Sequence, residues 1–212
     1  MAAASEFGAF QLARRTLRAP IPHELRGDLG MAVLVLALFL LQVFTGILLS
    51  LYYQPSPETV AESMQFIMRD VSWGWLLRGL HHWVSTGLIL VCCAHLARAL
   101  VGARYRGREW FWYLGACILP LVVALSFTGE LLVWDNQAYW TVREFLGDVE
   151  TIPAVGPELA DIVRGGSDVN ASTLSRVWTA HALFAPWLVW MLLTANLALI
   201  VRDVRRAWGS KP

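Results

Sequence analysis

Charged residues and cysteines are both scarce in this sequence of 212 residues, and each scarcity narrows what the chain can be. Only 16% of the residues are charged, and four long intervals carry no charge. The three cysteines lie inside two of those intervals and form no CxxC or CxxCH motif. A disulfide framework and covalent attachment of a c-type haem are therefore unsupported. The sequence also has no nucleophile elbow, P-loop or zinc-ligand spacing.

Apolar residues make up 57% of the chain, above the roughly 45–50% of soluble domains. The intervals without charge lie between Asp28 and Glu58, Arg78 and Arg98, Glu109 and Glu130, and Arg176 and Arg202. Since about 20 apolar residues in a helix cross a hydrocarbon core about 30 Å thick, each interval predicts one membrane-spanning helix. We place the four spans at about residues 29–53, 78–102, 110–133 and 177–202.

The connections between the spans predict short surface helices. The connection over residues 134–176 is too long for a simple turn and is punctuated by prolines and glycines, and a shorter surface helix is expected between the first two spans. Residues 1–27 repeat apolar side chains at helical spacing among arginines, which suits an amphipathic helix on the membrane surface; a partly disordered tail is the alternative. We therefore expect an all-α membrane protein with one four-helix domain over residues 1–212.

Lysines and arginines are unevenly distributed about the spans. Twelve fall in the N-terminal segment, the connection between the second and third spans and the C-terminus, whereas five fall in the other two connections and their helix ends. The positive-inside rule then predicts that both termini face the cytoplasm. We expect an integral protein of the bacterial inner membrane. The side of the termini is called the n-side below, and the opposite side the p-side.

Three histidines offer a site inside the membrane. His81 and His95 are 14 residues apart on the second span, about 40° short of four full turns, so they share a face and lie roughly 21 Å apart. His181 opens the fourth span on the p-side, level with His81. Two imidazoles facing each other in an apolar bundle make a bis-histidine haem site, although two unrelated hydrogen-bonded histidines are also possible. His82 points about 100° away and fits an interfacial histidine.

Sequence motifs along the chain resemble the cytochrome b family. The segment MRDVSWGWLLRGLHHWVSTGLILVCCAHLAR, residues 68–98, is similar to the second helix of that family. Further matches follow in the same order: FTG from Phe44, LG from Leu114, FTGELLVWDNQAYW from Phe127, IPAVG from Ile152 and STLSRVWTAHALFAPW from Ser172. The chain thus resembles the N-terminal, haem-binding half of cytochrome b, as in the split subunits of cytochrome bc-type quinol oxidoreductase complexes.

The resemblance implies a role for individual residues. His81 and His181 match the ligands of a p-side haem b, and His95 matches one ligand of an n-side haem b. Arg78 and Arg98 match arginines that offset the charge of haem propionates. The glycines that leave room for the haem planes match Gly46, Gly115 and Gly129.

The sequence departs from the family at the n-side site. The fourth histidine should lie about four helical turns after His181, at the positions where Ala195 and Asn196 stand. Ala32 occupies the place of the glycine expected about four helical turns before Gly46. We therefore predict one bis-histidine haem b on the p-side, and an n-side site that is either empty or holds a five-coordinate haem on His95. Replacement of the missing ligand by His23 is a further alternative.

The family also suggests a function and partners. The chain resembles a haem b-carrying membrane subunit of a quinone-linked electron-transfer complex, without a complete active site of its own. The PEWY motif of the quinol pocket is absent, and Glu130, Val133 and Thr141 depart from the family pattern. Expected partners are a C-terminal cytochrome b-half subunit, a Rieske iron–sulfur protein, a cytochrome c-type subunit, quinone and membrane lipid, but no nucleic acid. The alternatives are a single-haem anchor that links another dehydrogenase or reductase to the quinone pool, and a scaffold that has lost electron transfer.

Overall fold

Four long helices dominate the computed structural model, which describes residues 23–209 and the side chains of residues 25–207. They are α2 (His23–Ser50), α4 (Gly74–Val101), α5 (Glu109–Leu131) and a fourth built from α8 (Ala171–Thr179), the π-helical turn η1 (Ala180–Phe184) and α9 (Ala185–Gly209). Each is long and apolar enough to cross a membrane, and the described residues form no strand. The predicted all-α fold is confirmed, and each predicted span overlaps one of these helices. Segment 1–22 and the side chain of His23 lie outside the described residues.

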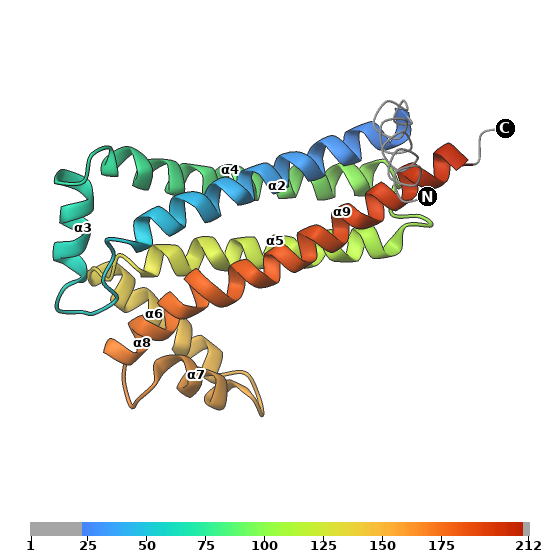
Figure 1. Ribbon diagram of the computed structural model, residues 1–212. Helices are drawn as coiled ribbons and strands as arrows, with labels where there is room; N and C mark the ends of the chain where they lie inside the picture. Colours follow the sequence, from blue (N-terminus) through green and yellow to red (C-terminus); the bar gives the residue numbers. More distant parts are fainter. Residues whose placement is uncertain (1–22, 210–212) are drawn as a thin grey trace, which may run out of the picture.

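The four long helices pack as a closed bundle, with contacts from α2 to α4, from α4 to α5, from α5 to α9 and from α9 back to α2. Each of the four helices contributes two side chains to one buried apolar layer: Val35, Phe39, Leu88, Cys92, Ile118, Val122, Val189 and Leu193. This layer separates a p-side end, where His81 and His181 lie, from an n-side end, where α2 begins and α9 ends (Figure 1). The p-side and n-side ends differ in the side chains that fill them and in the contacts that those side chains make.

Short helices cover the p-side end of the bundle, as predicted (Figure 1). Helix α3 (Val60–Arg69) joins α2 to α4, and helices α6 (Asn136–Glu150) and α7 (Gly156–Arg164) join α5 to α8. The carboxylate of Asp135 accepts a hydrogen bond from the backbone N–H of Ala138 at 2.8 Å and so caps α6. Helix α7 ends at Gly165, whose φ of 74° favours glycine.

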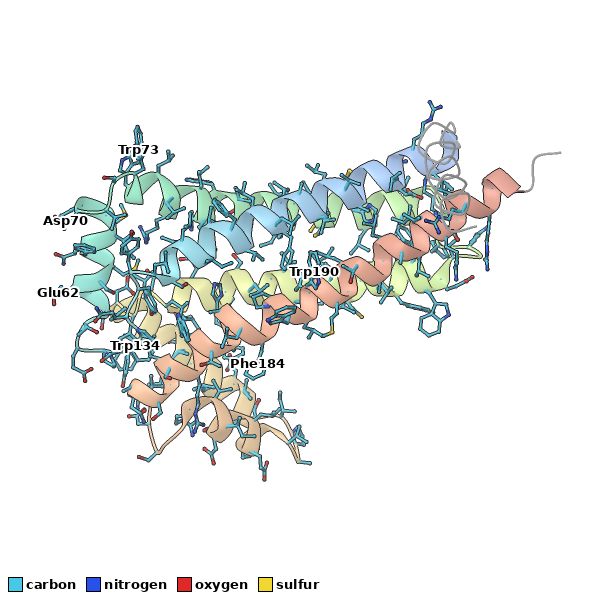
Figure 2. The ribbon with its side chains drawn as sticks, viewed as in Figure 1. Glu62, Asp70, Trp73, Trp134, Phe184 and Trp190 are labelled. Carbon is cyan, nitrogen blue, oxygen red and sulfur yellow. The ribbon has the colours of Figure 1, made fainter. Side chains whose placement is uncertain are left out.

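The outer surface of the bundle is rich in large apolar side chains. Trp73 and Phe184 project outward (Figure 2) and are 71% and 73% exposed. Phe44 and Trp187 are similarly exposed on α2 and α9. A soluble protein rarely shows so continuous an apolar surface, whereas a lipid-facing bundle requires one. The chain is an integral membrane protein.

The π-helical turn η1 shifts the register of the fourth helix. Pro186 follows this turn and has no N–H to return to the preceding carbonyls. Because a π-turn holds one residue more than an α-turn, position 196 takes the place that position 195 would have on a regular helix. Asn196 is accordingly buried, at 4% exposure, while Ala195 is exposed. Of the two positions considered for a fourth histidine, position 196 is the one that faces the bundle interior.

Candidate functional site

His81 on α4 and His181 in the π-turn face each other across the p-side end of the bundle. Their ring centroids are 6.3 Å apart, and the ring planes are inclined by 69°. Two imidazoles that bind one iron from opposite sides, each at about 2 Å from the metal as in zinc sites, have ring centres about 6 Å apart. The spacing of the two rings therefore fits a shared iron.

A threonine on a neighbouring helix orients the His81 ring. The Oγ1 of Thr45 lies 2.8 Å from Nδ1 of His81, and the same hydroxyl donates its proton to the backbone oxygen of Leu41 at 2.8 Å. Because a hydroxyl has one proton, Thr45 accepts from an N–H at Nδ1. The lone pair of this imidazole is then on Nε2, the atom available to a metal.

The same arrangement recurs at the second histidine. The Oγ1 of Thr128 lies 3.0 Å from Nδ1 of His181 and donates to the backbone oxygen of Ala124 at 2.8 Å. Our sequence interpretation missed both threonines. The signal for them is a repeated Phe-Thr-Gly triplet, at residues 44–46 and 127–129, in which each threonine immediately precedes a predicted clearance glycine.

Gly46 and Gly129 leave space for the histidine rings. A Cβ on Gly46 would lie 3.2 Å from Cε1 of His81, and a Cβ on Gly129 would lie 3.0 Å from Cε1 of His181. Both distances are tighter than an ordinary contact, so a side chain at either glycine would push the adjacent ring out of place. Gly115 differs, because its Cβ would meet Cδ2 of Leu96 at 3.1 Å and no histidine.

His81, His181, Gly46 and Gly129 line a cavity of about 370 Å³ within the bundle. Cofactor pockets of about 300–1,000 Å³ are usual. Arg78 also lines the cavity, and its Nη1 donates to Sδ of Met68 at 3.8 Å, a weak acceptor. No carboxylate among the described side chains forms an ion pair with Arg78. Its charge is available to an anionic group of a ligand in the cavity.

His82 and Glu130 line the cavity beside the facing histidines. Nδ1 of His82 lies 3.2 Å from Oε1 of Glu130, and the two side chains are 54% and 60% exposed. Tyr53 also lines the cavity, where its hydroxyl donates to the backbone oxygen of Leu132 at 2.8 Å. His82 therefore contacts Glu130 and is not part of the facing pair His81 and His181. Glu130 is one of the positions at which the sequence departs from the family pattern.

The n-side end presents a different environment to His95. His95 is 8% exposed, and its ring contacts that of Phe111 at 5.5 Å between centroids, edge to face. Nδ1 of His95 has no hydrogen-bond partner among the described residues. The side-chain amide of Asn196 donates to the backbone oxygen of Phe111 at 2.9 Å. The residue in place of an opposing ligand is therefore bound to α5, and in the described part of the chain no threonine bonds to Nδ1 of His95.

A buried carboxylate forms ion pairs with three arginines at the n-side end. Asp28 lies 2.8 Å from Nη1 of Arg108, 3.4 Å from Nη1 of Arg104 and 3.7 Å from Nε of Arg98. Nε of Arg108 also binds Asp203 at 2.8 Å. We call these five residues the n-side clasp. Arg98, unlike Arg78, has an internal partner.

The n-side end is also filled with apolar side chains. Ala32, at 8% exposure, packs in a buried cluster with one residue of α4, one of α5 and two of α9: Ala99, Phe111, Ile200 and Val204. The structure thus brings Gly46, His81 and Arg78 together with Gly129 and His181 at the p-side. It places the predicted residues His95, Arg98 and Gly115 apart from them, on the n-side of the central layer.

A four-helix membrane bundle with two facing histidines in its interior defines a class of haem-binding membrane proteins. Within that class, the chain belongs to the cytochrome b/b6/petB family, which it matches over residues 17–204. Membership of this family implies haem binding and a part in electron transport.

Curated relatives of the chain are cytochromes b6. It is 36% identical over 168 residues to cytochrome b6 of Mastigocladus laminosus, covering 79% of this chain and 78% of the relative. Cytochrome b6 of Synechococcus sp. (strain JA-3-3Ab) is 35% identical over 171 residues, 80% of each chain. The bundle is also similar to a chain of a solved structure described as a hyperthermophilic respiratory Complex III. That match has a TM-score of 0.71 and 28% identity, and it covers 80% of this chain but 46% of the other.

Proposed function

We propose that the chain is the haem b-carrying membrane subunit of a cytochrome bc-type, quinone-linked electron-transfer complex, with a single bis-histidine haem at the p-side end. The observation that carries this proposal is the facing pair His81 and His181, 6.3 Å apart, each with Nδ1 engaged by a threonine and Nε2 left for iron. Bound haem supplies a one-electron carrier that switches between ferric and ferrous iron.

The residues around the pair fit this role. Two histidine ligands leave no open position on iron for a substrate, which suits electron transfer rather than oxygen chemistry. Gly46 and Gly129 leave room for the rings, and Arg78 would offset the charge of a haem propionate. The central apolar layer separates the site from the n-side end of the bundle.

We propose further that the n-side end holds no haem. Among the side chains that the structure describes, no histidine opposes His95 and Nδ1 of His95 has no hydrogen-bond partner, and the ring is packed against Phe111. Arg98 is paired with Asp28. Because the His95 ring is packed and Arg98 already has a counter-ion, we favour the empty site over a five-coordinate haem on His95.

The comparisons support a set of partners. The relatives are cytochromes b6, and the solved chain from Complex III is about twice as long as the matched part. We therefore propose a separate C-terminal cytochrome b-half subunit, a Rieske iron–sulfur protein and a cytochrome c-type subunit as partners, and quinone as substrate. The proposed location is the bacterial inner membrane, with both termini in the cytoplasm.

A second candidate function is a single-haem subunit that links another dehydrogenase or reductase to the quinone pool. The hydrogen bond from Asn196 to the backbone of Phe111 favours it, because Asn196 stands where a second haem ligand would be needed. Without an n-side haem, electrons cannot pass across the membrane from one haem to a second. The scaffold alternative is disfavoured, because a chain that had lost electron transfer would have no use for the complete arrangement around His81 and His181.

Haem content of the purified complex tests the proposal. The pyridine haemochrome assay should give one haem b per copy of this chain, with a low-spin spectrum. His181→Ala should remove that spectrum, whereas His82→Ala, a change of the neighbouring histidine that lies off the axis, should keep it. A His181→Ala complex with an unchanged haem spectrum would refute the proposal.

A further inference from the structure

The side chain of Asp28 is 2% exposed and is surrounded by the arginines of the n-side clasp. A carboxylate buried to this degree is tolerated only when cations and hydrogen bonds compensate it. Asp28 has this compensation from three directions, and the Arg108 guanidinium also binds Asp203. Together these contacts join all four long helices at one end of the bundle.

We infer that Asp28 is a built-in counter-ion that takes the place of a second haem at the n-side end, so that the chain holds this end together by itself. The inference rests on the proposed function, in which the only haem lies at the p-side. In a two-haem relative, the arginine at position 98 would face the anionic propionate of a cofactor. Here the anion that Arg98 faces belongs to the chain.

The path of Arg98 gives a second, independent support. A Cβ on Gly27 would lie 1.8 Å from Nη2 of Arg98. The guanidinium therefore lies directly against the backbone of α2 at Gly27. Gly27 immediately precedes Asp28, so the same turn of α2 supplies both the space for the arginine and its counter-ion.

Phe111 and its contacts fill the part of the n-side end that lies next to the n-side clasp. Phe111 packs beside His95. The guanidinium of Arg108 lies over the same ring, with its Cζ 4.5 Å from the ring centre. Asn196 holds the backbone of Phe111 from α9. The three arginines of the n-side clasp are therefore paired with Asp28 inside the chain, while Nη2 of Arg108 and Nδ1 of His95 have no hydrogen-bond partner among the described residues. In the proposed function, an electron on the p-side haem has no second haem in this chain to move to.

A double-mutant cycle in the purified complex tests this role. Asp28→Asn should lower the melting temperature by roughly 10 °C, because it removes the buried counter-ion of three partly buried arginines. Arg98→Gln should lower it less. The loss in Asp28→Asn/Arg98→Gln should be smaller than the sum of the two single losses. Asp203→Asn serves as the matched control, since this more exposed carboxylate binds Arg108 but not Arg98, and it should show no such coupling to Arg98→Gln.

Haem content is measured on the same variants and should stay at one low-spin haem per chain. Additive losses of melting temperature, or loss of a haem in Arg98→Gln, would overturn the inference. If Asp28→Asn alone does not accumulate in the membrane, the double variant should restore accumulation, and failure to do so would also overturn it. A missing low-spin haem in the unaltered complex would instead refute the proposed function, and additivity alone would leave that function standing.

Discussion

Thr45 and Thr128 hold their histidines in the same way, from two different helices. Each lies one residue before a glycine that clears the adjacent ring, and each gives its own proton to a backbone oxygen one turn earlier. Each imidazole is therefore a donor at Nδ1 and free at Nε2. A hydrogen bond of this kind makes the ring a stronger ligand, because it raises the basicity of the nitrogen that binds the metal.

Thr45→Val and Thr128→Val should weaken haem retention about 10- to 100-fold, the usual effect of losing such a partner of a metal ligand. They should also raise the midpoint potential of the remaining haem, since a less basic imidazole stabilises ferric iron less. Haem retention during detergent washing and a redox titration measure both effects. Serine at either position keeps the hydroxyl and should behave as the unaltered chain. Thr194→Val is the control, because Thr194 bonds only to its own helix among the described contacts. Equal haem retention in all these variants would contradict the role of the threonines.

Gly46→Ala and Gly129→Ala should each lower the haem content of the purified complex. The added methyl would lie about 3 Å from a histidine ring and must move it. Gly87→Ala on α4 is the matched control, because a Cβ there meets nothing within 4 Å. It should keep full haem content and gain stability of about 0.5–1 kcal/mol from the better helix former. A normal haem spectrum in both the Gly46→Ala and the Gly129→Ala variant would contradict the claim that these glycines are needed to make room for the histidine rings.

The sequence was sufficient for the four spanning helices, since the intervals without charge are long and end abruptly at charged residues. It could also place His81 and His181 at one level, because each begins an apolar run on the same side of the membrane. It could not decide between Ala195 and Asn196, since that choice depends on a π-turn around His181 that no periodicity shows. The n-side clasp was equally hidden. In the sequence Asp28 marks only the edge of a span, and its burial depends on arginines that lie far from it in the chain.

Restoring the missing ligand should not restore a second haem. Asn196→His with Ala32→Gly supplies the histidine and the glycine that the family pattern requires, but Phe111 still packs on His95 and Asp28 still holds Arg98. The pyridine haemochrome assay should therefore remain at one haem per chain. Two haems in this double variant would show that the missing ligand and glycine alone had emptied the site, and that the packing around His95 yields to a cofactor.

Arg78 and Arg98 should respond differently to loss of charge. Arg78 lines the p-side cavity with no carboxylate partner among the described residues, whereas Arg98 lies on the far side of the central apolar layer and is paired with Asp28. A positive charge near a haem favours the reduced iron, so Arg78→Gln should lower the midpoint potential by roughly tens of millivolts. Arg98→Gln should leave that potential within a few millivolts of the unaltered value, since the charge it removes is distant and internally balanced. A redox titration of the two variants in the same complex, followed by absorbance of the reduced haem, measures the contrast. Equal shifts in both variants would mean that Arg98 also faces a haem, and would refute its assignment to the n-side clasp.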